Sequence, residues 1–197
     1  PWYRRLLEHM PPAVPLPAPE QIATPARLPA SEALEDWALL PTRPDWSTGF
    51  AEWQPGEKGA WRRWRDFCEV VDAYKAERDF PAIAATSKLS PHIHFGEISP
   101  RTLWYGLLDS YGEGPSCFRS ELAWREHGLN LIDQMPDYPD RNGRAGFAAF
   151  PWREGPEADR DFTAWTRGLT GYPVVDAGMR ELWVTGWMHN RVRMIVA

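Results

Sequence analysis

A proline-rich stretch near the start of the chain limits what this sequence can fold into. Residues 11–29 hold seven prolines among small and polar residues, a composition that favours extended polyproline conformation over a packed helix or strand. We therefore expect an interdomain linker over residues 11–30. It separates residues 1–10, which we expect to form the last helix or turn of a preceding domain, from the long segment 31–197.

The segment after the linker predicts helices and loops, and its apolar residues show no convincing strand alternation. Helical spacing predicts helices over residues 59–78, 121–133 and 174–185, and a last helix that starts near Met188. Residues 134–161 are rich in Pro, Gly, Asp and Arg, which predicts a long ordered loop or several turns. The fold class is therefore mainly α.

Capping residues mark the expected helix ends. Ser31, Ser90 and Ser99 are expected N-caps, and proline follows the last two at the first helical position. Gly186 is expected to close the 174–185 helix. The core stripe of that helix is expected to be Val175, Met179, Leu182 and Trp183.

The composition narrows the class of protein. Cys68 and Cys117 form no CxxC pair, which argues against a zinc site and a disulfide framework, so cytoplasm is the default compartment. His92 and His94 have no third ligand nearby, so we expect structural roles and no metal.

The net charge of -5 weakens a DNA-binding hypothesis without excluding it, because only the electrostatic field at the binding site matters for DNA binding. We expect most of the twelve tryptophans in the core, although tryptophan can also conduct electrons beside a redox cofactor.

Residues 86–90, Thr-Ser-Lys-Leu-Ser, form the first polar cluster that can carry chemistry. Their hydroxyls, the lysine and the helix start at Pro91 can converge on an anion such as a diphosphate. Plain helix capping is the more common explanation of such a sequence.

Glu121, Trp124 and Arg125 form a second cluster, on one face of a predicted helix. This face suggests a pocket where a base stacks and is hydrogen-bonded. A surface Glu–Arg pair beside a partly buried tryptophan explains it equally well. Asn190 and Arg193, with Arg191 beside them, form either a cationic surface or a solvated helix side.

Taken together, these segments resemble the DNA photolyase and cryptochrome family in order and spacing. The matching runs are residues 78–81 (Arg-Asp-Phe-Pro), 86–90, 95–101 (Phe-Gly-Glu-Ile-Ser-Pro-Arg), 121–126 (Glu-Leu-Ala-Trp-Arg-Glu), 170–182 and 186–194. The resemblance covers residues 31–197. It implies the N-terminal part of an all-helical FAD-binding domain of a class I-like deoxyribodipyrimidine photolyase, with residues 1–10 as the end of an α/β antenna domain.

The resemblance implies FAD as the cofactor, with an antenna chromophore such as a folate or a deazaflavin in the upstream domain. It also implies a monomer whose partner is DNA containing pyrimidine dimers, with no role for a membrane. The residues expected to contact the cofactor are Tyr74, Thr86, Ser87, Lys88, Leu89, Ser90, Phe118, Arg125 and Arg193.

The activity implied by the resemblance is light-driven DNA repair, a carbon–carbon lyase reaction. An electron passes from photoexcited reduced flavin to a flipped-out cyclobutane pyrimidine dimer, splits the ring and returns. Glu121 would hydrogen-bond the dimer and stabilise its radical anion, and Asn190 would lie near the reacting part of the flavin. Trp152 would be the outermost tryptophan of an electron-transfer chain. The residues expected to contact DNA or the lesion are Arg78, Glu121, Trp124, Arg125, Asn190, Arg191 and Met194.

Two other functions stay open at this point. One is a cryptochrome, a blue-light photoreceptor without repair activity, and the other is a non-catalytic interaction domain. Glu121 and Trp124 favour repair, because a pure sensor needs neither a dimer hydrogen bond nor a stacking platform. His127 and Phe118 depart from common family residues and leave cyclobutane versus (6-4) specificity open. Family members continue past the equivalent of Ala197, so we expect weak FAD binding and no repair from the 197-residue chain alone.

Overall fold

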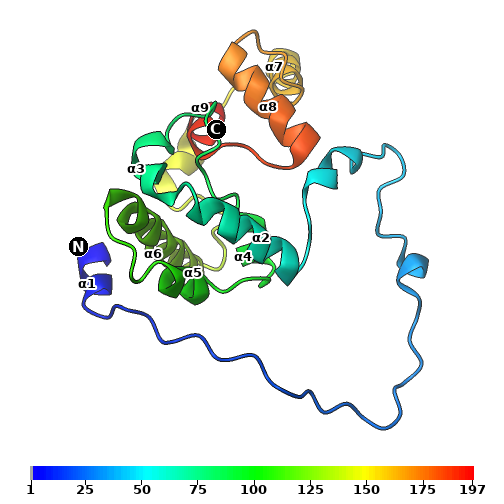
Figure 1. Cartoon of the computed structure of the whole chain (residues 1–197). Coiled ribbons are helices and arrows are strands. Elements are labelled where there is room, and N and C mark those ends of the chain that lie inside the picture. Colours follow the sequence, from blue (N-terminus) through cyan, green and yellow to red (C-terminus); the bar gives the residue numbers. More distant parts are fainter. Residues whose placement is uncertain (1) are drawn as a thin grey trace.

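The computed structural model describes residues 2–197, and within this range the chain forms helices and turns but no strand (Figure 1). The prediction of an all-helical domain is therefore confirmed. None of the described helices is both long and apolar enough to cross a membrane. The α-helices are α1 (Trp2–Leu7), α2 (Glu57–Cys68), α3 (Tyr74–Glu77), α4 (Ser90–His94), α5 (Pro100–Gly106), α6 (Glu113–Gln134), α7 (Pro156–Thr166), α8 (Pro173–Thr185) and α9 (Asn190–Val196), and the 3-10 helices are η1 (Leu34–Trp37), η2 (Thr48–Glu52), η3 (Val71–Ala73) and η4 (Ala145–Ala149).

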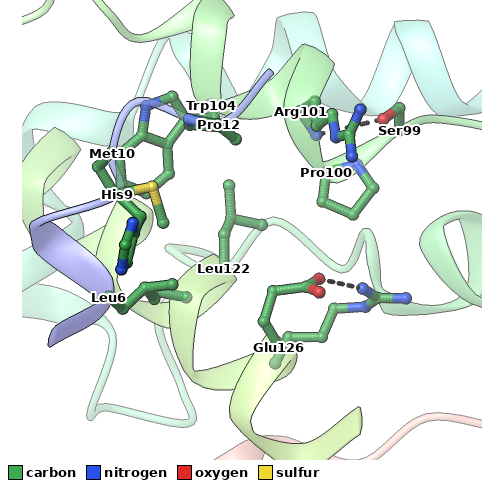
Figure 2. A pocket seen from close by; sticks show the side chains of 12 residues that line it. Leu6, His9, Met10, Pro12, Ser99, Pro100, Arg101, Trp104, Leu122 and Glu126 are labelled. Carbon is green, nitrogen blue, oxygen red and sulfur yellow. Dashed lines mark hydrogen bonds and ion pairs between the residues drawn. The ribbon is translucent and has the colours of Figure 1, made fainter. Parts of the chain in front are cut away.

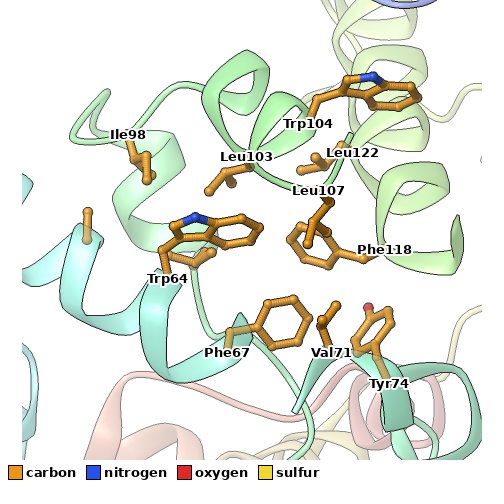
Figure 3. Packing of buried hydrophobic residues seen from close by; sticks show 12 residues of the cluster. Trp64, Phe67, Val71, Tyr74, Ile98, Leu103, Trp104, Leu107, Phe118 and Leu122 are labelled. Carbon is orange, nitrogen blue, oxygen red and sulfur yellow. The ribbon is translucent and has the colours of Figure 1, made fainter. Parts of the chain in front are cut away.

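The larger of two apolar clusters lies between α2, α3, α5 and α6 (Figure 3). The rings of Trp64, Phe67 and Phe118 meet at its centre, and Leu103 and Leu107 of the α5 region close it from the other side. This packing fixes the long helix α6 against the first part of the domain. Helix α6 carries residues 121–126, the Glu-Leu-Ala-Trp-Arg-Glu run of the candidate site.

The smaller cluster joins α8 to α9 through Met179, Met188 and Val192. This pair of helices is attached to the first part of the domain next to η2, because the indole N–H of Trp53, the residue after η2, donates to the Thr185 carbonyl at 2.8 Å. A second attachment, the hydrogen bond from Arg191 to Asp79, brings α9 close to the end of α3.

The proline-rich segment forms no helix or strand over residues 11–30 and is largely exposed (Figure 1). Its start is attached to the domain, because the Tyr105 hydroxyl donates to the Pro12 carbonyl at 2.8 Å and Met10 packs on the larger cluster. The short helix α1 agrees with the expected helix in residues 1–10, although Pro1 lies outside the described residues.

The prediction of one continuous helix over residues 59–78 is wrong, because the structure divides this range. The chain leaves α2 at Cys68 and passes through η3 before α3 begins. The start of α6 crosses at this point, and a Cβ added to Gly114 would lie 2.0 Å from the Val71 carbonyl oxygen. The buried residues keep helical spacing, but the close crossing interrupts the helix that the spacing alone predicts.

The expected caps are only partly correct. Ser99 caps α5, accepting from the Arg101 N–H at 3.2 Å. Ser90 is wrong as a cap, because it is the first residue of α4 and Leu89 takes the cap position without a side-chain bond. Ser31 is also wrong, because Ala33 precedes η1 and the Ser31 hydroxyl bonds the Glu32 carbonyl instead.

These caps predict unequal effects of two similar substitutions. Ser99→Ala should lower the free energy of unfolding by about 1 kcal/mol, because it removes an N-cap acceptor. Ser90→Ala should change it by less than about 0.5 kcal/mol, because that hydroxyl caps nothing. Urea unfolding of both variants measures the difference, and equal losses would contradict the assignment of the caps.

The predicted helix over residues 174–185 is confirmed as α8, and Gly186 closes it with a φ of 72°. Its expected core stripe is wrong at the C-terminal end, because Leu182 is 39% and Trp183 67% exposed. The loop expected over 134–161 is wrong at its end, where α7 already begins at Pro156.

Asp176 fixes the start of α8. Its carboxylate accepts hydrogen bonds from the Thr170 backbone N–H and hydroxyl, both at 2.7 Å, and from the Gly171 N–H at 3.0 Å. These bonds, the Thr170 hydroxyl above all, hold the pKa of Asp176 below its usual value. The Thr-Gly-Tyr-Pro turn is thereby tied to the helix that it precedes.

This network predicts a pH-dependent contribution to stability. Because folding lowers the pKa of Asp176, its contribution is present above the unfolded value near 3.8 and is lost as the pH falls toward the folded value. The difference in free energy of unfolding between wild type and Asp176→Ala should therefore be largest near neutral pH and shrink below pH 3.8. Urea unfolding across this range tests it, with Asp133→Ala at an exposed position as the control. A difference that does not vary with pH would contradict it.

Candidate functional site

Arg78 and Glu121 form the central ion pair of the candidate site. Arg78 follows α3 directly, and its guanidinium contacts the Glu121 carboxylate of α6 at 2.6 Å, with side-chain exposures of 13% and 40%. Burial alone would lower the pKa of Arg78, but the hydrogen bond to Glu121 and a contact with the Cys117 sulfur raise it above its ordinary value. The guanidinium therefore stays charged and holds the carboxylate of Glu121 in one orientation.

A second ion pair extends this one toward α9. The Arg191 Nε donates to Asp79 at 2.7 Å, and Asp79 also lies 3.8 Å from the Nε of Arg78. The hydrogen bond from Arg191 is the main cause that lowers the pKa of Asp79. Glu121, Arg78, Asp79 and Arg191 thus form a string of alternating charges, which we call the charged string.

His189 sets the orientation of α9. It is 3% exposed, and its Nδ1 accepts from the Arg191 backbone N–H at 3.2 Å as the N-cap of the helix. Burial lowers the pKa of His189, so the ring is neutral near pH 7 and its Nδ1 can act as an acceptor. This cap places Arg191 beside Asp79, while the weak contact between Arg191 and the Met194 sulfur, at 3.3 Å, keeps Met194 nearby.

A cavity of about 430 Å³ lies beside Glu121, between α3, α4 and α6. Its volume falls within the range of roughly 300–1,000 Å³ that is common for small-molecule sites. Five of the expected cofactor residues line it, namely Tyr74, Ser87, Ser90, Phe118 and Arg125, and so do two expected lesion residues, Glu121 and again Arg125. Burial raises the pKa of Tyr74 to about 12, so its phenol stays protonated.

The other expected cofactor residues do not line this cavity. Leu89 is 1% exposed and belongs to the core, and Thr86 lies half-buried outside the lining. Lys88 has a φ of 48°, and its ammonium lies 4.7 Å from the ring of Trp187. The Arg193 Nε donates to the Met188 carbonyl at 3.0 Å and so holds the turn before α9.

Trp124 does not line the cavity that Glu121 and Arg125 share. Its ring packs against α1, with centroids 5.6 Å from Trp2 and 5.9 Å from Tyr3, and 5.6 Å from His127 of its own helix. It nevertheless remains 48% exposed. The structure therefore brings Glu121 and Arg78 together, and it places Trp124 one turn further along α6 on the side that faces α1.

Two of the expected catalytic residues lie apart from the cavity. Asn190 is exposed as the first residue of α9. Trp152 is 68% exposed, and its ring lies 4.7 Å from that of Phe150 beside an open hollow next to α7. Neither is among the residues that line the cavity beside Glu121.

A further cavity of about 400 Å³ lies between α1, α5 and α6 (Figure 2). Arg125 lines it as well and pairs there with Glu126 at 2.7 Å. The described residues contain no group of three side chains suited to a metal ion. His92 forms a 2.5 Å contact with Glu97, which also accepts from the Gly56 N–H at 2.7 Å, so the Glu97 carboxylate ties the start of α2 to α4.

Sequence reasoning missed three residues of this site. Asp79 completes the charged string, His189 caps α9 and Trp187 lies under Lys88. All three stand within runs that the sequence already singles out, Asp79 next to Arg78, His189 next to Asn190 and Trp187 three positions before Asn190. Adjacency to a predicted site residue was the available signal, but the pairing of Asp79 with Arg191 spans more than a hundred positions.

Comparison with known proteins gives these features a context. A family model described as the FAD binding domain of DNA photolyase matches residues 118–197. The deoxyribodipyrimidine photo-lyase of Agrobacterium fabrum is 46% identical over 203 residues, which cover 100% of this chain and 42% of that protein. The Escherichia coli deoxyribodipyrimidine photo-lyase is 36% identical over 203 residues, covering 100% of this chain and 41% of that protein.

Solved structures give the same result. The crystal structure of a class III photolyase from Agrobacterium tumefaciens superimposes with a TM-score of 0.91 and 45% identity, covering 99% of this chain and 41% of that one. A Synechocystis cryptochrome superimposes with a TM-score of 0.67 and 30% identity, covering 75% of this chain and 32% of that one. The chain thus spans less than half the length of these relatives.

Proposed function

Because this chain belongs to the DNA photolyase and cryptochrome family and carries part of its FAD-binding domain, we propose that the protein repairs cyclobutane pyrimidine dimers with light. The activity is that of a deoxyribodipyrimidine photo-lyase. The observation that carries the proposal is the Arg78–Glu121 pair, which holds a carboxylate at the edge of a cavity, with the half-exposed Trp124 one helical turn further along α6.

The residues around the cavity fit FAD in their chemistry. The hydroxyls of Ser87 and Ser90 and the guanidinium of Arg125 are donors suited to a diphosphate, and Phe118 and Leu122 supply an apolar wall for a ring. Lys88 adds a positive charge from the same loop. Bound FAD, reduced and excited by light, supplies the electron that opens the cyclobutane ring and takes it back.

The protein residues bind and orient the lesion. A carboxylate accepts hydrogen bonds, so Glu121 is suited to receive one from an imide N–H of a flipped-out pyrimidine. Arg78 keeps the Glu121 carboxylate in place, and the exposed ring of Trp124 offers a stacking surface. A DNA phosphate can compete with Asp79 for Arg191, because that ion pair is half-exposed.

The proposal also assigns a part of the photolyase architecture to each segment of the chain. Residues 31–197 form the N-terminal part of the FAD-binding domain, residues 11–30 the linker and residues 1–10 the end of an α/β antenna domain. Asn190 lies near the reacting part of the flavin and Trp152 conducts electrons from the surface. We propose a cytoplasmic monomer that acts on DNA, and an antenna chromophore bound upstream.

A cryptochrome-type photoreceptor is the second candidate, supported by the likeness to the Synechocystis cryptochrome. Binding in the dark separates the two. The protein encoded by the complete reading frame, loaded with FAD, should bind an oligonucleotide with one thymine dimer at least about tenfold more tightly than the undamaged oligonucleotide, the effect of one good stacking or charged contact. Equal binding of the two oligonucleotides would favour the photoreceptor.

A further inference from the structure

The aromatic residues of α1 lie against the ring of Trp124. The Tyr3 ring is nearly parallel to the Trp124 ring, with an interplanar angle of 12° and a centroid distance of 5.9 Å. The Trp2 ring lies 5.6 Å from Trp124 and 4.6 Å from His127, so four rings from two helices form one group. We call Trp2, Tyr3, Trp124 and His127 the aromatic group.

Helix α1 contributes little else to the domain. It is six residues long and none of its residues is buried, and an isolated helix of this length is not stable in water. The linker that follows it is largely exposed, although its start is attached to the domain through Met10 and Pro12. This attachment and the contacts with α6 hold α1 in place, and the aromatic group makes the closest ring contacts between α1 and α6.

The same contacts restrain Trp124. An indole on an exposed helix side can adopt several rotamers, and a stacking surface works best when one rotamer is fixed before the base arrives. Tyr3 covers part of the ring in a near-parallel orientation, His127 meets it edge-on, and about half of the residue stays open.

We propose that Tyr3 and Trp2 are positioning residues, which hold the indole of Trp124 in the orientation that stacks on a pyrimidine dimer. This inference rests on the proposed function, because it assigns a supporting role to residues behind the lesion contact. It places part of the specificity for damaged DNA in α1, on the N-terminal side of the linker.

The measurement is dark binding of dimer-containing and undamaged single-stranded oligonucleotides by the FAD-loaded protein of the complete reading frame. Tyr3→Ala and Trp2→Ala should each lower the ratio of the two affinities by about two- to tenfold, the range of one aromatic pair. Tyr3→Phe should keep the wild-type ratio, because the ring remains. Thermal unfolding should change little in all three variants, since α1 buries no residue.

A double-mutant cycle with Trp124→Ala decides whether Tyr3 acts through Trp124. If it does, Tyr3→Ala has no further effect once Trp124 is alanine. Full additivity of the two losses, or an unchanged ratio in Tyr3→Ala and Trp2→Ala, would overturn the inference. Failure of the proposed function looks different, because wild type itself would then not distinguish the two oligonucleotides.

Discussion

Replacing Phe118 by alanine is expected to lower the free energy of unfolding by about 3–5 kcal/mol. Phe118 is 4% exposed and its ring meets those of Phe67, Tyr74 and Trp64 at centroid distances of 4.7, 5.7 and 5.9 Å. The loss includes the transfer of the ring and the void left among rigid neighbours. Urea unfolding measures it.

The matched control is Phe95→Ala, where the ring is 75% exposed and the change should stay within about 0.5 kcal/mol. Phe118 also lines the cavity beside Glu121, so FAD retention should fall in the same variant. A loss below about 1 kcal/mol would contradict the central place of Phe118 in the core.

Replacing Glu121 by glutamine is expected to weaken dark binding of dimer-containing DNA by about 10- to 100-fold, the effect of losing a charged hydrogen bond worth about 1.5–3 kcal/mol. The substitution keeps the shape of the side chain but removes the charge that Arg78 holds at 2.6 Å. Affinity for undamaged DNA should stay close to the wild-type value, because in the proposed function the only part of the DNA that Glu121 contacts is the lesion.

Glu126→Gln is the control for this variant. Glu126 lies on the same helix and also pairs with an arginine, Arg125, at 2.7 Å, but it lines the other cavity. Fluorescence anisotropy with labelled oligonucleotides gives both affinities. Equal effects of the two substitutions would show that charge on α6, and not the position of Glu121, governs binding.

Local sequence signals predicted the elements that depend on neighbours along the chain. The helices around Glu121 and Met179, the cap at Ser99 and the close at Gly186 all follow from spacing, hydroxyls and a glycine in the left-handed region. The break after Cys68 could not be predicted this way, because it results from the crossing of α6 at Gly114. Tertiary contacts decide where a helix that is predicted from periodic spacing is interrupted.

In the candidate site, too, local spacing predicted some features, and contacts between distant segments determine the others. Spacing placed Glu121 and Arg125 on one face, and both line one cavity. Spacing alone could not place Trp124 against α1 or pair Asp79 with Arg191, because those partners lie beyond the linker or at the far end of the chain. The helix pattern therefore predicts which residues share a face, and contacts between distant segments determine which partners these residues meet.

Light-dependent loss of thymine dimers tests the central claim most directly. The FAD-loaded protein of the complete reading frame is reduced, mixed with a dimer-containing oligonucleotide and illuminated with blue light, and the return of absorbance near 260 nm reports intact thymines. We predict dimer loss that needs light and falls strongly in Glu121→Ala. No dimer loss in the illuminated wild-type protein, with FAD bound and reduced, would contradict the repair function.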